Sequence, residues 1–361
     1  MSELLNSYVC TVAQPSMRPV YKTADSPFRP ECIRENLDRV LGLVERAVKD
    51  HGAKLVVFPE FCVQGYALGR SIADWERAGV TLPGPETAEI AKLARDRDVH
   101  VAGAVYERIP AFPGRYFMSG FLVAPDGATP EAQLKFAYRK VYALTHKSRP
   151  GDMYDHYVAR FGHDALFPVA ATRLGKIGCA VAADIAWPEV PRTLAMKGAE
   201  LIFNPTAAAK APGYASPSED PDQPVAPAMP MVRRVRAWEN LMYLAMSNIG
   251  PFYDADSRSG AERIMSEIVD FQGRVIARAN TQEETLVSAE IDMKALRAHR
   301  GGNPRFNYLA QLQPQLHAPD YAVHKLCALN GMAAPHADEA AAVEHIGKSW
   351  KAMVASGVFN G

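Results

Sequence analysis

The chain has little of what several common classes of protein require. Its 361 residues include 40 lysines and arginines and 40 aspartates and glutamates, so no net charge favours nucleic acid or an anionic membrane as a partner. No apolar run approaches the roughly 20 residues that span a bilayer. Residues 1–12 lack the charged and apolar regions of a signal peptide. We therefore expect a cytoplasmic protein with no membrane segment and no nucleic-acid partner.

Cysteine is also scarce, and this limits disulfides and metal sites. The five cysteines are Cys10, Cys32, Cys62, Cys179 and Cys327. Their number is odd and no two have the spacing of metal ligands, which argues against a disulfide framework. The chain also lacks a G-x-G-x-x-G motif, a phosphate loop and a His-Glu-x-x-His motif. We therefore predict neither a metal nor an organic cofactor.

What the chain does contain is an alternation of short apolar runs with helical patterns. The predicted strands are 8–13, 55–58, 99–105, 118–125, a run that closes at 181, 201–204, 241–248, 266–271, 275–279 and 285–291. The predicted helices are 31–50, 87–97, 191–198 and 231–240. This order predicts an α/β fold with helices packed on sheets. Composition alone does not select one α/β fold among several.

Two segments depart from this alternation. Residues 211–230 hold many prolines and few apolar residues, which predicts a long loop, and such loops are usually functional or disordered. Residues after His299 form a tail with a polar, proline-containing start and a helical end at 338–354. We therefore predict one domain at 1–300 and a C-terminal extension at 301–361.

Three short segments carry residues suited to chemistry. Glu60 follows the apolar strand Val56-Val57-Phe58 and Pro59, so it lies at a carboxyl end, where α/β sites tend to form. Lys140 stands in a Tyr-Arg-Lys-Val run. The third segment reads Ala-Ala-Asp-Ile-Ala-Trp-Pro-Glu over residues 182–189, where a strand gives way to a helix. Backbone N–H groups at that helix start would favour an anion.

Together these segments resemble the nitrilase superfamily of carbon–nitrogen hydrolases, in its amidase- and carbamoylase-like branch. The resemblance runs from about residue 8 to residue 300 and includes motifs at 198–205, 236–240 and 290–292. It implies an α/β four-layer αββα sandwich with a C-terminal extension. In this family such extensions often contact a neighbouring subunit, so we expect a homodimer or higher homo-oligomer. The alternative is a tail packed on its own subunit.

The family's catalytic triad is Glu, Lys and Cys, and the resemblance assigns these roles to Glu60, Lys140 and position 182. Amide hydrolysis by a thiol needs a nucleophile, a group that moves protons and a group that holds the oxyanion. Glu60 would be the general base, Lys140 the oxyanion stabiliser, and Ala182 occupies the place of the nucleophilic cysteine. Without the resemblance, a surface glutamate and a solvated lysine would be the favoured explanations of the first two.

Residues near this triad are the candidates for substrate binding and for support of the elbow, the sharp turn between strand and helix that begins at position 182. Asp184, Trp187 and Tyr142 are the substrate-binding candidates, and Asp184 is also expected to bond backbone at the elbow. Arg192 is expected to pair with a carboxylate.

Cys179 does not replace the missing nucleophile. It lies about 10 Å along the strand from position 182 and on the opposite face, which predicts a core thiol.

The family's second glutamate, which positions substrate in the loop after the lysine, has no clear counterpart. The nearest groups are Asp152, Asp155 and His146.

The resemblance implies hydrolysis of a non-peptide C–N bond in a small-molecule amide or carbamoyl substrate, through a thioester. An amide would give a carboxylic acid and ammonia. Ala183-Asp184 favours amide-type substrates over nitriles, while an N-carbamoyl amino acid hydrolase or a nitrilase parent remains an alternative.

Two hypotheses explain the missing thiol. In one, the cysteine of an enzyme was changed to alanine to trap substrate; in the other, the chain is a natural pseudoenzyme with a binding role. The presence of Glu60 and Lys140 favours the first.

Overall fold

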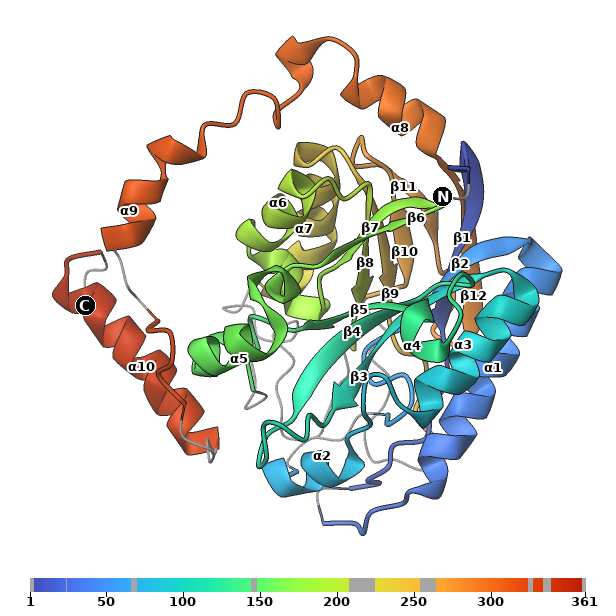
Figure 1. Ribbon diagram of the computed structural model, residues 1–361, viewed down its shortest axis with the longest axis horizontal. Coiled ribbons are helices and arrows are strands. Elements are labelled where there is room, and N and C mark those ends of the chain that lie inside the picture. Colours follow the sequence, from blue (N-terminus) through green and yellow to red (C-terminus); the bar gives the residue numbers. More distant parts are fainter. Residues whose placement is uncertain are drawn as a thin grey trace.

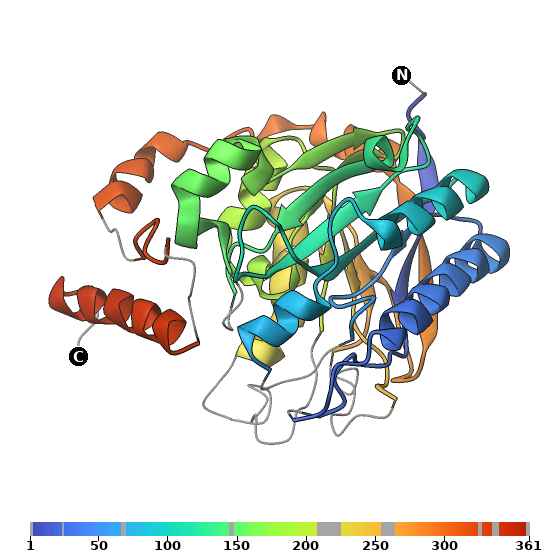
Figure 2. The same ribbon diagram turned by 60° about the horizontal axis from the view of Figure 1, so that its bottom comes forward.

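Two six-stranded sheets face each other, and helices cover their outer faces (Figures 1 and 2). The computed structural model describes residues 3–23, 25–65, 70–143, 148–207, 225–253, 264–323, 327–333 and 339–358. Among these residues, no helix combines the length and apolar character that a membrane crossing needs. Nor do any three His, Cys, Asp or Glu side chains of the described ranges gather as metal ligands.

The first sheet carries its strands in the order β12-β1-β2-β3-β4-β5. These strands are β1 Ser7–Gln14, β2 Ala53–Val57, β3 His100–Glu107, β4 Phe117–Val123, β5 Leu134–Arg139 and β12 Thr285–Asp292. Strands β1, β2 and β3 are parallel, while β4 is antiparallel to both β3 and β5. Strand β5 therefore runs in the same direction as β2, and both end at the same edge of the sheet.

The second sheet repeats this arrangement in the order β11-β10-β9-β8-β7-β6. Its strands are β6 Val169–Thr172, β7 Gly175–Cys179, β8 Leu201–Pro205, β9 Tyr243–Ser247, β10 Glu267–Val269 and β11 Val275–Arg278. Strands β7, β8 and β9 are parallel, and the other pairs are antiparallel. The predicted hairpin near residue 272 is confirmed as β10 and β11.

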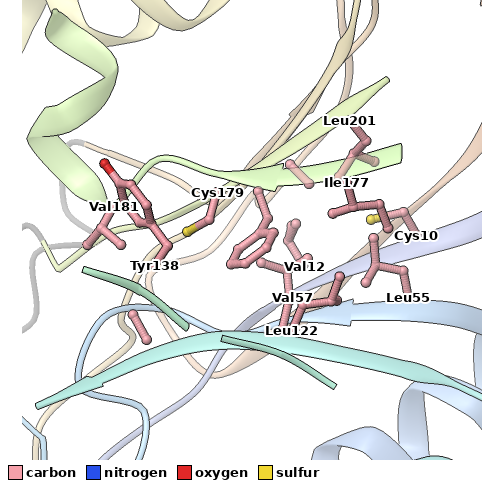
Figure 3. Packing of buried hydrophobic residues seen from close by; sticks show 14 of the residues in the cluster. Cys10, Val12, Leu55, Val57, Leu122, Tyr138, Ile177, Cys179, Val181 and Leu201 are labelled. Atoms are coloured by element: carbon pink, nitrogen blue, oxygen red, sulfur yellow. The ribbon is translucent and has the colours of Figure 1, made fainter. Parts of the chain in front are cut away.

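Three apolar layers alternate with the sheets. The layer between the sheets joins side chains such as Cys10, Leu55 and Val57 of the first sheet to Ile177 and Leu201 of the second (Figure 3). Outside the first sheet, α1 Glu31–His51 and α3 Pro85–Arg97 pack on a second layer. Outside the second sheet, α6 Glu189–Met196 and α7 Val225–Glu239 pack on a third. The predicted αββα sandwich is thus confirmed.

The strand β2 shows why both faces of a sheet had to be apolar. Leu55 and Val57 point into the layer between the sheets, while Val56 points into the layer beneath the helices. A strand buried on both faces reads as a continuous apolar run, which is how its sequence reads. The remaining helices are α2 Ile72–Ala78, α4 Pro130–Gln133, α5 Tyr154–Phe161, α8 Met293–Arg300, α9 Ala318–Val323 and α10 Glu339–Ala355.

Several boundaries differ from the sequence predictions. Strand β7 ends at Cys179, so the predicted end at residue 181 was wrong by two residues. Strands β5 and β6 and helices α2 and α5 were not predicted. The predicted loop 211–230 was wrong for its last part, because α7 begins at Val225 and contains Pro230. Residues 211–224 of that predicted loop lie outside the described residues.

The C-terminal extension runs from α8 around one side of the sandwich, and α10 stands away from the sheets in both views (Figures 1 and 2). The predicted terminal helix is confirmed as α10. One stretch of the extension packs on its own chain: Asn330 N donates to Gly151 O at 2.9 Å, and Met332 N donates to Asp152 O at 3.1 Å. Tyr321 Oη also donates to Glu189 Oε1 at 2.6 Å.

Candidate active site

Glu60 and Lys140 form a buried ion pair between two strand ends. Glu60 follows β2 after two intervening residues, and Lys140 directly follows β5. Because β2 and β5 run in the same direction, both side chains lie at the same edge of the sheet. Lys140 Nζ donates to Glu60 Oε1 at 3.0 Å, and the two side chains are 5% and 4% exposed. Neither residue is therefore a solvated surface group.

Ala182 begins a sharp elbow after β7. It is the first residue of the 3-10 helix η3 Ala182–Ala186, and its φ of 43° lies in the left-handed region that side-chain-bearing residues rarely adopt. The elbow then leads through Trp187 and Pro188 into α6. This geometry presents the side chain of residue 182 at the end of a strand and before a helix N-terminus.

Asp184 joins the elbow to the segment that carries Lys140. Its Oδ2 accepts from Tyr138 Oη at 2.6 Å, and its Oδ1 accepts from Tyr142 N at 2.8 Å. Tyr138 and Tyr142 each lie two residues from Lys140, so the carboxylate holds both flanks of the lysine. Complete burial raises the pKa of Asp184 to about 6, while the Lys140 ammonium and the two hydrogen bonds act in the opposite direction. Asp184 does bond backbone as predicted, but its partner is Tyr142 N in the segment after Lys140 and not a group of the elbow itself.

The carbonyl groups of the elbow are held by two side chains to which no role was assigned from the sequence. Asn204 Nδ2 donates to Ala180 O at 2.6 Å and to Ala182 O at 3.1 Å. Arg236 donates from Nε to Ile185 O at 3.2 Å and from Nη2 to Ala186 O at 3.1 Å. A polar Asn204 at the end of a buried apolar strand was the available signal, because such ends are where α/β sites form.

Two aromatic candidates lie against each other at the same place. The rings of Tyr142 and Trp187 stack with centroids 4.5 Å apart and an interplanar angle of 7°. Tyr142 comes from the segment after β5 and Trp187 from the end of the elbow, so the stack is a second link between the two sheets' contributions. Arg192 pairs with Glu239 on α7 at 3.5 Å, which confirms its predicted carboxylate partner.

Cys179 is confirmed as a core thiol. It is fully buried in the layer between the sheets, near Val181 and Tyr138 (Figure 3). Burial raises the pKa of its thiol well above the ordinary value, and the negative charges of Asp184 and Glu60 act in the same direction. A thiol held in its neutral form is a poor nucleophile. Cys62 is also fully buried, and its pKa is raised to about 12.

The family's second glutamate has no counterpart among the predicted candidates that the structure describes. Asp152 accepts from Arg149 Nη2 at 2.7 Å and from Arg149 N at 2.9 Å, so its carboxylate closes a local turn. Asp155 is exposed at the start of α5. His146 lies outside the described residues.

Comparison with known proteins identifies the family. The carbon–nitrogen hydrolase family matches residues 13–300. The chain belongs to this family. It is 27% identical to the omega-amidase NIT2 of Bos taurus over 273 residues, which is 76% of this chain and 88% of that protein.

Solved structures show the same fold. Nit3 of Saccharomyces cerevisiae, described as a member of branch 10 of the nitrilase superfamily, superposes with a TM-score of 0.60 at 20% identity. That match covers 83% of this chain and 96% of the other. A cysteine-to-alanine mutant of an amidase from Nesterenkonia sp. AN1, in complex with butyramide, gives a TM-score of 0.58 at 20% identity. It covers 86% of this chain and 96% of that one.

Proposed function

We propose that the chain is an amidase-type hydrolase of small-molecule amides whose nucleophile position is occupied by Ala182. The observation that carries the proposal is the buried 3.0 Å ion pair between Lys140 Nζ and Glu60 Oε1. The elbow lies next to the segment that carries this lysine, because Asp184 accepts a hydrogen bond from Tyr138. Burial of two opposite charges at strand ends is costly unless both are well paired. Such an arrangement suits proton transfer and oxyanion stabilisation better than structural support.

The proposed chemistry requires a thiol in place of the Ala182 methyl group. Glu60 would take the thiol proton, and the thiolate would attack the amide carbon. Lys140 and a backbone N–H of the elbow would hold the negative charge on the oxygen. Glu60 would then give its proton to the leaving ammonia and activate water, which cleaves the thioester to the carboxylic acid. No step requires a metal or organic cofactor.

Without the thiol, the unaltered chain should bind substrate and barely turn it over. Removal of the nucleophile of another hydrolase lowers turnover by about 10⁶ while binding survives. The Nesterenkonia amidase supports this reading, since its cysteine-to-alanine mutant was obtained with butyramide. The relative described as an omega-amidase and the Asp184 position both favour an amide over a nitrile, with N-carbamoyl compounds as the nearest alternative.

Of the three residues predicted to bind substrate, Tyr142 and Trp187 keep that role in this proposal, and Asp184 takes another. Tyr142 and Trp187 form a stacked aromatic surface beside the elbow, suited to the acyl part of a small amide. Asp184 is fully buried, with both of its oxygens bonded to Tyr138 and Tyr142. Its role is therefore to order the pocket rather than to touch substrate.

The extension 301–361 is proposed to contact a second subunit in the cytoplasm. The described part of the extension exposes large apolar side chains at Leu316, Tyr321, Val323, Leu329, Ile346, Trp350 and Val358. Exposed apolar side chains gathered in one segment commonly mark an association surface. Sedimentation of the full chain would test this proposal, since a monomer at all concentrations would contradict it.

A second candidate function is that of a natural pseudoenzyme, in which the pocket binds a ligand or partner without chemistry. The alanine at residue 182 favours it. The intact pair of Glu60 and Lys140 favours a hydrolase, because a binding protein has no need of a buried proton-transfer group.

The test is to compare the unaltered chain with its Ala182→Cys variant on a panel of amides, N-carbamoyl compounds and nitriles. Activity that appears only in the variant would support the hydrolase, and the panel would name the substrate class. A well-folded variant with no activity on any compound would favour the pseudoenzyme.

A further inference from the structure

Residue 182 is held in a backbone conformation that costs free energy. Its φ of 43° is left-handed although the residue is not glycine. The direction of any side chain at this position depends on that conformation. The groups that hold the neighbouring carbonyls therefore decide where a thiol at residue 182 would stand.

Asn204 donates hydrogen bonds to two of these carbonyls. It is fully buried at the end of β8, and its Nδ2 donates to Ala180 O at 2.6 Å and to Ala182 O at 3.1 Å. These two carbonyls stand on either side of residue 181 and include that of the elbow residue itself. An amide NH₂ has two N–H groups, so each carbonyl receives its own donor.

Arg233 fixes which end of the Asn204 amide faces the elbow. Arg233 Nε donates to Asn204 Oδ1 at 3.1 Å. An asparagine amide could in general be turned either way round, and only its surroundings decide. Because a guanidinium can donate and never accept, it requires the oxygen of Asn204 on its side. The NH₂ group then faces the elbow.

Arg233 is a buried cation whose carboxylate partner, Glu267, lies at long range. The side chain is fully buried on α7, and burial lowers its pKa to about 10. Its Nη1 lies 3.7 Å from Glu267 Oε1, and within the described part of the chain neither Nη1 nor Nη2 makes a hydrogen bond. A buried guanidinium with so few partners is costly to the core. The orientation of Asn204 is a role that would account for keeping this arginine buried.

We propose that Asn204, oriented by Arg233, is a positioning residue for the nucleophile position at residue 182. Neither side chain need touch the reacting atoms; both act through the carbonyls of Ala180 and Ala182. The inference rests on the proposed function for the meaning of position 182. The hydrogen bonds themselves do not depend on that function.

The test uses an Ala182→Cys background that also carries Cys327→Ser, because Cys327 is the exposed cysteine and the other four are buried. Asn204→Asp keeps the shape but turns an acceptor toward two carbonyls, and Asn204→Leu removes the donors without adding charge. The readout is the rate at which iodoacetamide alkylates the introduced thiol across a range of pH. This measurement needs no substrate.

We expect both Asn204 variants to lower the alkylation rate near neutral pH by about tenfold or more, because a displaced thiol loses the nearby Lys140 ammonium. The pH midpoint of alkylation should rise in parallel. With a turned-over amide, kcat should fall more than KM rises. Arg233→Lys keeps the charge and loses the Nε donor, so it should give a smaller shift in the same direction.

Gln133→Glu is the matched control. Gln133 is also a fully buried amide: its Nε2 donates to Ala91 O at 2.9 Å and Ala124 O at 3.0 Å, and its Oε1 accepts from Arg95 Nη2 at 2.6 Å. It precedes β5, at the opposite end of that strand from Lys140. Its loss should lower the melting temperature and leave the alkylation rate and pH midpoint unchanged.

The inference is overturned if folded Asn204 variants alkylate at the background rate with the same pH midpoint. If those variants do not fold, Arg233→Lys decides in the same way. If the Asn204 variants alkylate more slowly as predicted but the Ala182→Cys protein hydrolyses no compound, the positioning role stands and the proposed function is contradicted. If the Ala182→Cys protein hydrolyses an amide but the Asn204 variants alkylate at the background rate, the proposed function stands and the positioning role is contradicted.

Discussion

The two sheets contribute unequal halves to the candidate site. The first sheet supplies Glu60 and Lys140, which are present and joined at 3.0 Å. The second supplies the elbow at Ala182, where the proposed chemistry would require a thiol. Yet the second half has the more extensive support, since Asn204, Arg236 and Asp184 all bond to or across the elbow.

Under the proposed function, what the site lacks is a single side chain. A site that had lost its function altogether would be expected to lose the groups that support it as well. Here the left-handed conformation at Ala182, the hydrogen bond from Asn204 to its carbonyl and the ion pair of Glu60 and Lys140 are all present. The two halves can therefore be tested separately.

The largest effect is expected from Glu60→Gln in the Ala182→Cys background, which breaks the first half alone. Loss of a general acid–base group typically lowers turnover by about 10² to 10⁴. KM should change little because the shape of the side chain is kept. Steady-state kinetics on a hydrolysed amide would measure this, with the exposed Glu290→Gln as the control. A Glu60→Gln variant within about threefold of its background would contradict the assignment.

Lys140→Met in the unaltered chain should cost roughly 3–5 kcal/mol of unfolding free energy, because it leaves Glu60 buried without its partner. The double variant with Glu60→Gln should recover part of that loss. Urea unfolding of the four proteins in this cycle measures the coupling. Additive losses would show that the pair is not a unit and would weaken the first half of the comparison.

Asp184→Asn examines the link between the two halves through pH. The pKa of Asp184 is about 6 in the folded protein and 3.8 as the ordinary value, so the folded state holds its proton more tightly. The contribution of Asp184 to the free energy of unfolding is therefore fully present below about pH 4 and is lost as the pH rises to about 6. The Asn variant has no group that titrates at this position, so its free energy of unfolding does not fall for this reason. Relative to the unaltered chain it should gain up to about 3 kcal/mol between these limits, as measured by urea unfolding. A constant difference across that range would contradict the shifted pKa.

Tyr321→Phe should give the smallest effect. The Tyr321 hydroxyl donates to Glu189 Oε1 at 2.6 Å, but the side chain is 66% exposed. Exposed polar contacts contribute about 0–1 kcal/mol. We expect a change in kcat/KM below about threefold in the Ala182→Cys background. A loss of about tenfold or more would show that the extension belongs to the site.

The sequence predicted the residues whose neighbours form a recognisable motif. Glu60 and Lys140 could be placed because each stands in a short run that resembles a family motif, and Asp184 because it stands two residues after position 182. Their mutual distance could not be predicted, because it depends on β5 running parallel to β2 in the sheet. Strand β5 was missed since its alternation, Leu-Lys-Phe-Ala-Tyr-Arg, is short and rich in basic residues.

The supporting groups were harder to predict for a different reason. Asn204 and Arg233 are 29 residues apart and meet only after α7 packs on the second sheet. The start of α7 was itself concealed by Pro230, since proline inside a helix removes a backbone donor and usually argues for a loop. Pro230 is the sixth residue of α7, past the first four N–H groups that have no partner within the helix, so the helix continues through it with one backbone hydrogen bond fewer.

The most direct measurement is calorimetric titration of the unaltered chain with the amide that the Ala182→Cys variant hydrolyses best. If one thiol is all that is missing, the unaltered chain should bind that amide with a Kd within about threefold of the variant's KM, while turning it over about 10⁶-fold more slowly. No binding at concentrations that saturate the variant would contradict the account, because the pocket would then differ in more than one side chain.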